Sequence, residues 1–539
     1  MDNNANPKIL IAGAGPSGLI LALALRRNGV PVRVIDKLAT PALGQRGPAI
    51  SPRTQEILRT LGVLDDVKKW AISPPPIRTY AGTEPLKTFS MTAALEATPV
   101  FPFREPIWIG QNRLEGVLRD ALHKYSCEVE FGTTLVSLVR DMNGVDATIV
   151  KEDGKEETQR FEFLVGADGA RGVVRKQLGL TFLGESRPGN NAIIGDIRVE
   201  GLGQDYWHMW GELASQCVFL RPTGEPNLFG LISSFSGLDC DAVMKDRAAF
   251  QDALDTVTGR KDLKVLELVW LAPWRPNIRM VNKFSAGRCF VAGDAGHVHS
   301  PTGGQGLNSG AQDSFNLAWK LALVINGQAP ISLLDSYDEE RTPVIKEMLR
   351  TTTDLLNRNA NSDDDSRWDR GGPLLMLGVN YRWSTIVLDE QNEVPTDKTP
   401  NDAYGVELRG LKAGDRAPDA PELKDVRGGQ TAAHLFDVFD PSRHTVLALS
   451  PSPERAAALV AQLSRYPQGV VRFTVIIRNG AEIGPGVDMV LEDTAGHAHT
   501  NYAFEGGCEI AVVRPDGVIG AVVRGPEGVG RYFSKIFNV

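Results

Sequence analysis

The chain has 539 residues, which at roughly 100–200 residues per domain predicts about three domains. Apolar residues make up 42% and charged residues 23%, a balance that excludes a chain disordered throughout its length. The net charge of −8, without a long Lys/Arg run, argues against a nucleic-acid partner. The five cysteines form no CxxC pair, which excludes zinc-ribbon and thioredoxin-type redox sites and favours a reducing, cytoplasmic location.

An apolar run from Ile9 to Leu25 follows a polar start. It contains three glycines and a proline, lacks a basic leader and is at the short limit for crossing a bilayer, so we expect neither a signal peptide nor stable membrane insertion. We interpret it as a strand at Ile9–Ala12, a turn, and a helix at Leu19–Asn28. A second strand is predicted at Val30–Ile35.

The turn between the first strand and helix has the GxGxxG spacing of a dinucleotide-binding βαβ unit, and Asp36 follows 18 residues after its last glycine. Gly13 permits the tight turn, Gly15 lets a pyrophosphate approach the backbone, and Gly18 lets helix and strand pack closely. Asp36 would accept hydrogen bonds from a ribose. The motif alone does not distinguish FAD from NAD.

Two more apolar strands, Phe163–Gly166 and Cys289–Ala292, also end at turns that carry an aspartate, Asp168 and Asp294. Ligands of open α/β sheets bind at the carboxyl ends of the strands, so we expect these turns to converge on one ligand. Because Asp294 directly follows a buried strand, we expect it to be partly buried, either hydrogen-bonded to a ligand hydroxyl or capping a helix.

The middle and last parts of the chain have a different character. Short strand-like segments at Ala192–Arg198, Cys217–Arg221 and Leu228–Ser234 predict an inserted mixed or antiparallel sheet. A helical region is predicted from Pro330 to about Leu388. The final 120 or so residues alternate strands with an Ala-rich helix, as in a small separate α/β domain.

Four motifs, in order and at family spacing, resemble the class A flavoprotein aromatic monooxygenases, the group of para-hydroxybenzoate and phenol hydroxylases. The resemblance covers about residues 8 to 345. The motifs are the Gly13–Gly18 turn, Gly166–Arg171, Gly293–His297 and His299–Asn308.

The resemblance implies an α/β fold with a Rossmann-like FAD-binding domain, an inserted mixed β-sheet substrate domain and a C-terminal thioredoxin-like domain. The implied division is 1–186 for the first part of the FAD-binding domain, with 76–105 contributing to the substrate domain, 187–276 for the substrate domain, 277–390 for the second FAD-binding part and helices, 391–421 for a linker, and 422–539 for the thioredoxin-like domain without CxxC.

The resemblance also implies the residues that hold FAD. The glycine turn and Asp36 hold the ADP part, Asp294 hydrogen-bonds the ribityl chain, and the 301–308 loop lies beside the isoalloxazine. The implied set is Gly13, Gly15, Pro16, Ser17, Gly18, Asp36, Lys37, Arg46, Gln111, Asp168, Asp294, Pro301, Gly304, Gly306, Leu307 and Asn308.

The sequence departs from the family pattern at two positions, of which the second bears on catalysis. Gly172 stands where the second motif usually has serine, and Pro48 stands where phenol hydroxylases carry the aspartate that deprotonates the phenol. The catalytic residue is therefore left open, with Arg46, Pro301 and Gly303 as candidates.

Aromatic residues of the inserted sheet are candidates for the substrate pocket. Tyr206, Trp207 and Trp210 would line it, although a plain core position explains them equally well. The His297-Val298-His299 and His497-Ala498-His499 pairs resemble metal ligands. In its motif context the first pair is better explained as structural or flavin-side residues, and the second has no third ligand in view, so we expect no metal site.

The implied function is hydroxylation of a phenolic or other electron-rich aromatic substrate with O2 and NADPH or NADH, through a flavin C4a-hydroperoxide. Baeyer–Villiger or epoxidation chemistry on the same fold remains an alternative, and so does a flavin-binding protein that sequesters a reactive metabolite. The expected partners are a small aromatic substrate and O2. The sequence leaves a homodimer open.

Overall fold

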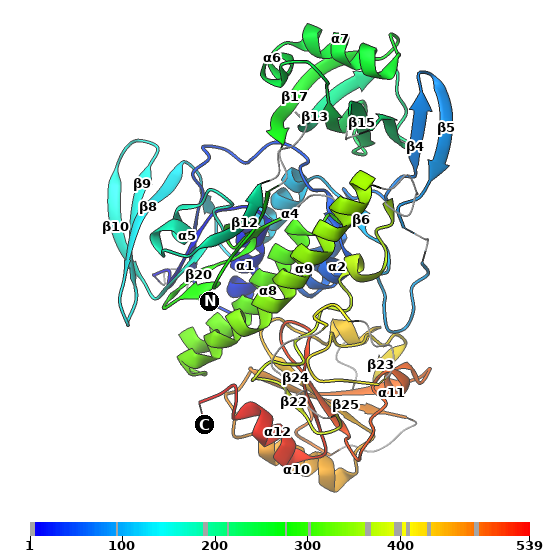
Figure 1. Cartoon of the computed structure of the whole chain (residues 1–539). Coiled ribbons are helices and arrows are strands. Elements are labelled where there is room, and N and C mark those ends of the chain that lie inside the picture. Colours follow the sequence, from blue (N-terminus) through cyan, green and yellow to red (C-terminus); the bar gives the residue numbers. More distant parts are fainter. Residues whose placement is uncertain are drawn as a thin grey trace.

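The computed structural model describes residues 6–92, 95–186, 192–212, 215–274, 277–299, 303–361, 368–392, 402–405, 410–427, 433–478 and 484–538. The candidate Pro301 lies outside these residues. Figure 1 shows a central body crossed by two long helices, an upper sheet capped by α6 and α7, and a separate sheet-containing body below. No helix of the described residues is long and apolar enough to cross a membrane.

The central body is built on a six-stranded sheet in the order β19-β20-β11-β1-β2-β7. Every pair in it is parallel except β19 with β20. The strands are β1 (Ile9–Ala12), β2 (Val32–Ile35), β7 (Val129–Glu130), β11 (Phe163–Gly166), β19 (Ser285–Ala286) and β20 (Cys289–Val291). All four residues of β1 are buried, which explains its uninterrupted apolar sequence.

Helices pack against this sheet and against each other. The first helix, α1 (Pro16–Arg27), contacts both α4 (Gln111–His123) and α8 (Gly306–Ile325). It begins three residues earlier than predicted, because Pro16 fits the first helical position, where its fixed φ and missing N–H cost nothing. The other helices here are α2 (Pro52–Thr60), α3 (Leu64–Lys68), α5 (Val173–Gln177) and α9 (Asp335–Asn361).

Smaller sheets extend the central body. One contains β8 (Thr133–Arg140), β9 (Val145–Lys151) and β10 (Glu156–Phe161), and another contains β12 (Phe182–Ser186), β18 (Asn277–Val281) and β21 (His297–Val298). A two-stranded sheet joins β3 (Ala49–Ile50) to β6 (Ile107–Trp108).

The upper sheet has seven strands in the order β17-β13-β16-β15-β14-β4-β5. It is mixed, because β14 and β4 run parallel while the other pairs are antiparallel. Its outer face is covered by α6 (Cys240–Lys245) and α7 (Arg247–Thr258). The strands are β4 (Ile77–Ala81), β5 (Glu84–Phe89), β13 (Ala192–Glu200), β14 (Trp207–Gly211), β15 (Cys217–Pro222), β16 (Leu228–Ser234) and β17 (Lys264–Trp274).

The lower body contains a second seven-stranded sheet, in the order β22-β28-β27-β24-β25-β26-β23. Its helices are α10 (Pro453–Leu463), α11 (His497–Asn501) and α12 (Pro526–Phe533). The strands are β22 (Leu388–Asp389), β23 (Leu423–Asp425), β24 (His444–Leu449), β25 (Val471–Ile477), β26 (Met489–Asp493), β27 (Ile510–Val513) and β28 (Ile519–Val523).

Two sequence expectations on the path to this body need correction. The helix α9 ends at Asn361, and the described residues from 368 to 387 form turns and a short 3-10 helix rather than a continuing helix. Within the expected linker 391–421, the described stretch 410–421 is packed: Ala417 and Asp419 are fully buried, and Arg416 reaches Glu56 of α2 at 2.7 Å. Its prolines end regular structure without exposing the segment.

Buried charges join the lower body to the central one. Glu340 of α9 lies within 2.8 Å of Lys320 on α8 and within 2.7 Å of Arg514 in the turn after β27. All three side chains are fully buried. Asn316 donates a further hydrogen bond to Glu340 at 2.6 Å.

Candidate active site

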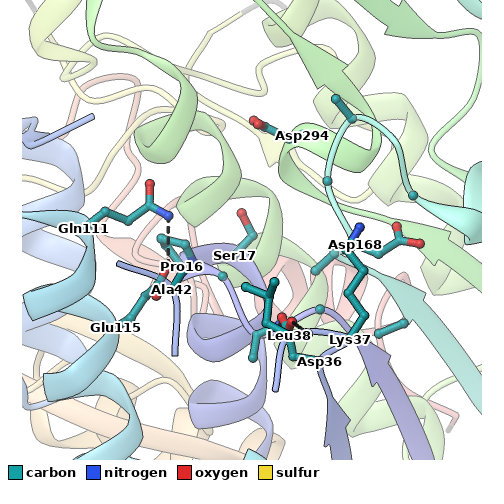
Figure 2. A pocket seen from close by; sticks show the side chains of 18 of the residues that line it. Pro16, Ser17, Asp36, Lys37, Leu38, Ala42, Gln111, Glu115, Asp168 and Asp294 are labelled. Carbon is teal, nitrogen blue, oxygen red and sulfur yellow. Dashed lines mark hydrogen bonds between the residues drawn. The ribbon is translucent and has the colours of Figure 1, made fainter. Parts of the chain in front are cut away.

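A cavity of about 820 Å³ lies at the carboxyl ends of β1, β11 and β20. The turns after all three strands contribute to its wall, so the predicted convergence is what the structure has. Figure 2 shows residues of these turns around one space, with Gln111 and Glu115 contributed by α4. The candidate residues on its wall are Gly13, Gly15, Pro16, Ser17, Asp36, Lys37, Arg46, Gln111, Asp168, Asp294, Gly304, Gly306 and Leu307.

The glycines of the first turn have distinct steric roles. A Cβ on Gly13 would lie 2.2 Å from the carbonyl oxygen of Ala167, and one on Gly18 would lie 2.0 Å from that of Gly13. A Cβ on Gly15 would meet no atom within 4 Å. Gly13 and Gly18 therefore allow the backbone to pack, whereas Gly15 leaves room on the cavity side for a ligand at the N-terminus of α1.

Ser17 fills a narrow gap on the other side of the same turn. A Cβ on Gly293 or on Gly310 would lie 2.3 Å from its Oγ. The close fit locks the start of α1 against α8 and the turn after β20.

Asp36 at the end of β2 is oriented by the backbone around it. Its carboxylate accepts hydrogen bonds from Ala14 N at 2.8 Å and from Leu38 N at 2.9 Å. Each oxygen keeps a further lone pair toward the cavity, which suits a ribose hydroxyl. Lys37 beside it is exposed.

Asp168 has a structural task as well as a place on the wall. Its Oδ2 accepts hydrogen bonds from Val173 N at 2.6 Å and Val174 N at 3.1 Å, and so caps α5. A Cβ on Gly172 would lie 2.1 Å from Asp168 Oδ1, so the glycine in place of the family's serine makes room for this cap. Burial raises the pKa of Asp168, against the hydrogen bonds from Val174 and Val173.

Asp294 presents a carboxylate without a hydrogen-bond partner among the described residues. Its side chain is accessible from the cavity although protein surrounds it, and it caps no helix. The protein around the cavity raises its pKa by desolvation, against the attraction of His297 and Arg46. An unpaired acceptor on a cavity wall fits a polyhydroxyl ligand.

Asp313 of α8 organises the protein beneath this turn. Its carboxylate accepts from Gly293 N at 3.0 Å, His297 Nε2 lies at 2.8 Å, and Arg341 Nε lies at 2.7 Å. Burial alone would raise the pKa of Asp313, but Arg341 and His297 hold it at about 2. His297 thus faces Asp313, whereas His299 lies over Gly306, so the two histidines do not point to one metal position.

The N-terminus of α8 opens onto the cavity without a side-chain cap. Gly304 has a φ of +63°, which favours glycine, and a Cβ on Gly306 would lie 2.9 Å from His299 Nε2. Asn308 does not line the cavity: its amide donates to Ala49 O and Gly304 O and accepts from Ser51 N, which fixes the loop. Gly303 also lies off the wall.

Gln111 lies on the opposite side of the cavity from Asp168 (Figure 2), and Arg46 is another residue of its wall. Arg46 is exposed and has a φ of +44°, unusual for a residue with a side chain. Gln111 donates to Glu115 at 2.8 Å, the dashed line in Figure 2. Burial raises the pKa of Glu115, with Gln111 opposing.

The three substrate candidates do not face one space. Trp210 is fully buried on the outer side of the upper sheet, stacked on Tyr80 at 4.7 Å, and Tyr206 packs under Arg78 on that side. Trp207 faces the central body, where Trp108 lies 5.7 Å away. Side chains alternate between the two faces of a strand, so Trp207 and Trp210 lie on opposite faces of β14. The sequence did not reveal which of these faces is the outer one.

Several wall residues were not singled out from the sequence. They are Arg119, Phe131, Thr133, Thr134 and Leu135. Thr133 to Leu135 begin β8, which follows β7 at the end of the central sheet near Asp36. The sequence signal was weak because short strands of this kind carry no motif.

Comparisons with known proteins bear directly on this site. A family model described as "FAD binding domain" matches residues 6–352. A flavin-dependent monooxygenase of Mycobacteroides abscessus is 35% identical over 489 residues, covering 88% of this chain and 96% of that protein. The chain belongs to the FAD-dependent monooxygenases.

Other FAD-dependent monooxygenases share its full length. The pentachlorophenol 4-monooxygenase of Sphingobium chlorophenolicum is 30% identical over 537 residues, covering 96% of this chain and 94% of that protein. The crystal structure of aklavinone-11 hydroxylase with FAD and aklavinone matches with a TM-score of 0.80 at 25% identity, covering 99% of each chain.

The cavity fits the FAD of this family on three observations. Gly15 leaves open space at an uncapped helix start, Asp36 offers carboxylate oxygens beside the glycine turn, and Asp294 offers an unpaired acceptor for a hydroxyl-bearing chain. The Tyr206, Trp207 and Trp210 positions remain outside this cavity.

Proposed function

We propose that this FAD-dependent monooxygenase hydroxylates a phenolic substrate, with NADPH or NADH as reductant and O2 as oxidant. The observation that carries the proposal is the single cavity at which the turns after β1, β11 and β20 meet the N-terminus of α8. The names of full-length relatives support the reaction class, since one acts on pentachlorophenol.

Bound FAD supplies the redox and oxygen-transfer chemistry, and the protein binds, orients and shields it. We propose that Asp36 accepts the ribose hydroxyls and Asp294 those of the ribityl chain. The N-terminus of α8 carries roughly half a positive charge, which stabilises negative charge on a ring placed beside it. Gly304 lets backbone N–H groups approach that ring without a Cβ.

Catalytic roles for Arg46 and Gly303 remain proposals. Arg46 lies on the cavity wall in a left-handed conformation, and Gln45 beside it is held by Asp196 at 2.6 Å. We propose that this loop guides the flavin between positions for reduction and for oxygen transfer. Because the sequence has one GxGxxG turn after a strand, we propose that NAD(P)H docks transiently, and Asp168 remains a candidate for contacting it.

The lower body is proposed to be a thioredoxin-like domain. Its support is the element order β24, α10, β25, β26, α11, β27, β28, α12, with β24 between β25 and β27 in the sheet. Cys508 is the one cysteine in 422–539 and is buried, so dithiol chemistry within this domain is excluded. We propose that the domain serves in packing or in contact with a second copy. A cytoplasmic location stays a prediction.

A panel of phenols tests the proposal. Each phenol is mixed with the FAD-loaded enzyme and NADPH or NADH, and cofactor oxidation and product mass are followed. At least one phenol should accelerate oxidation and yield a product heavier by one oxygen. An inserted ester oxygen or an epoxide would favour the alternative chemistries, and no substrate-stimulated oxidation would favour a sequestering protein.

A further inference from the structure

Two side chains of opposite charge, Asp196 and Arg221, lie on the inner face of the upper sheet, in one row that runs across neighbouring strands. The strand register pairs Trp270 with Asp196, Asp196 with Gly230, and Gly230 with Arg221. A Cβ on Gly230 would lie 2.4 Å from Arg221 Nη2. The glycine therefore leaves the space in which the guanidinium lies across the sheet toward Asp196.

Arg221 is a cation without a hydrogen-bond partner among the described residues. Its guanidinium carbon lies 5.5 Å from the ring of Trp108, and no carboxylate comes within salt-bridge distance in the described part of the chain. Burial lowers the pKa of Arg221 to about 10, with Asp196 opposing, so it stays charged at neutral pH. A charge held inside a protein is costly unless it is paired.

Neither nearby acid forms a salt bridge with Arg221 among the described residues. Asp196 is 2% exposed, its Oδ2 accepts from Gln45 N at 2.6 Å, and its Oδ1 is buried without a hydrogen-bond partner among the described residues. Burial raises the pKa of Asp196, against this hydrogen bond. Glu225 is held by Arg113 at 3.0 Å. The N–H donors of Arg221 are thus left for another acceptor.

A second unused donor lies beside Arg221. His208 pairs with Leu220, which makes Trp207 the cross-strand neighbour of Arg221. The Trp207 indole Nε1 is buried and has no hydrogen-bond partner within the described part of the chain. The ring of Trp207 packs edge-on against Trp108 at 5.7 Å. Two donors and an aromatic wall therefore occur together.

We propose that Arg221 and the Trp207 indole N–H form a subsite for a negatively charged oxygen, a phenolate or a carboxylate, on the aromatic substrate. A planar guanidinium suits an oxyanion, and Trp108 supplies an apolar surface for the ring. The subsite lies on the face of the sheet toward the cofactor cavity, since Asp196 in the same row holds the loop that carries Arg46. The assignment rests on the proposed hydroxylase function and deepens it.

Calorimetric titration of the FAD-loaded enzyme, without NAD(P)H, tests the subsite. The probes are 4-nitrophenol at alkaline pH as the phenolate, benzoate as the carboxylate, and 4-nitroanisole as a neutral match. We expect the wild type to bind one anion at least about tenfold tighter than the ether, and Arg221→Met to bring that ratio near one. Which anion is preferred identifies the oxygen.

Three further variants separate charge from structure. Arg221→Lys should keep part of the preference, and Gly230→Ala, which retains Arg221 but displaces its guanidinium, should reduce it. Arg198→Met on the same sheet, where Arg198 pairs with Glu267 at 3.2 Å, should leave it unchanged. FAD content and circular dichroism verify the fold.

The proposal is overturned if the wild type shows no preference for either anion, or if Arg221→Met keeps the wild-type ratio. Because binding is measured without turnover, a failed hydroxylation assay leaves this result unaffected, and the two proposals fail separately.

Discussion

At the residue scale, the three aspartates that follow strand ends do different work. Asp36 orients the glycine turn, Asp168 caps α5, and Asp294 is left with an unpaired carboxylate on the cavity wall. The sequence placed all three at one edge of the sheet because each follows a buried strand. It did not reveal their hydrogen bonds, which depend on loops packed later in the fold.

Asp294→Ala should weaken FAD binding by tenfold or more, because a hydrogen bond to a charged group contributes about 1.5–3 kcal/mol. The dissociation constant is measured by titrating the apoprotein with FAD and following flavin fluorescence. Asp146→Ala, at an exposed pair with Arg160, is the matched control. Equal affinity in the two variants would remove Asp294 from the cofactor site.

His444 makes a second prediction at this scale. It is fully buried among aromatic rings, and neither ring nitrogen has a hydrogen-bond partner among the residues that the structure describes. Burial lowers its pKa to about 3, with Arg514 adding to the effect. In the unfolded chain the imidazole of His444 has a pKa of about 6.5, so below that pH it binds a proton that it does not bind in the folded protein. Stability should therefore fall as the pH drops below about 6.5, by about 1.4 kcal/mol per unit.

His444→Phe should remove this part of the acid sensitivity, since phenylalanine fits an aromatic cluster and does not titrate. Thermal unfolding at pH 7 and pH 5 compares the two proteins. The wild type should lose about 2 kcal/mol more than the variant between these pH values. A parallel loss in both proteins would show that His444 does not stay neutral when folded.

At the scale of elements, the β1–α1 turn shows what a motif can predict. The strand, the helix and the acid at the end of β2 are local features that the sequence carries. Which face of β14 points inward is not a local feature of the sequence. Whether Trp207 or Trp210 points inward depends on how β14 pairs with β4 and β15. The substrate wall was therefore predicted less well than the cofactor cavity.

Two alanine substitutions in that turn should affect different properties, one the stability of the apoprotein and the other its affinity for FAD. Gly18→Ala places a Cβ 2.0 Å from Gly13 O, so it should lower the melting temperature of the apoprotein. Gly15→Ala meets no protein atom and should leave that temperature nearly unchanged while weakening FAD binding. Melting curves of both apoproteins, with FAD titrations, test the contrast. A stable Gly18→Ala that binds FAD normally would contradict this account of the turn.

At the scale of the whole molecule, the lower body is joined to the cofactor body by buried charges. Asn316 and Lys320 on α8 and Glu340 on α9 meet Arg514 from the turn after β27. Burial lowers the pKa of Lys320 to about 8, against the attraction of Glu340. The sequence suggested a linker before this body because prolines and polar residues are frequent there. It gave no sign of a contact between residues so far apart.

Arg514→Met should destabilise the protein by about 3–5 kcal/mol, because it removes one partner from a buried ionic cluster. Thermal unfolding measures the loss. Arg455→Met, at a partly exposed pair with Glu509 in the same body, is the control and should cost under about 1 kcal/mol. A melting temperature no lower than that of the control would mean that the cluster does not hold the two bodies together.

The most direct test of the whole account is the origin of the new oxygen. The FAD-loaded enzyme is given NAD(P)H and an accepted phenol under 18O2, and the product is analysed by mass spectrometry. A monooxygenase built around this cavity should place one 18O atom in the aromatic product. The Asp294→Ala variant, assayed without bound FAD, should yield no labelled product. An unlabelled hydroxyl, or product formed without FAD, would contradict the account.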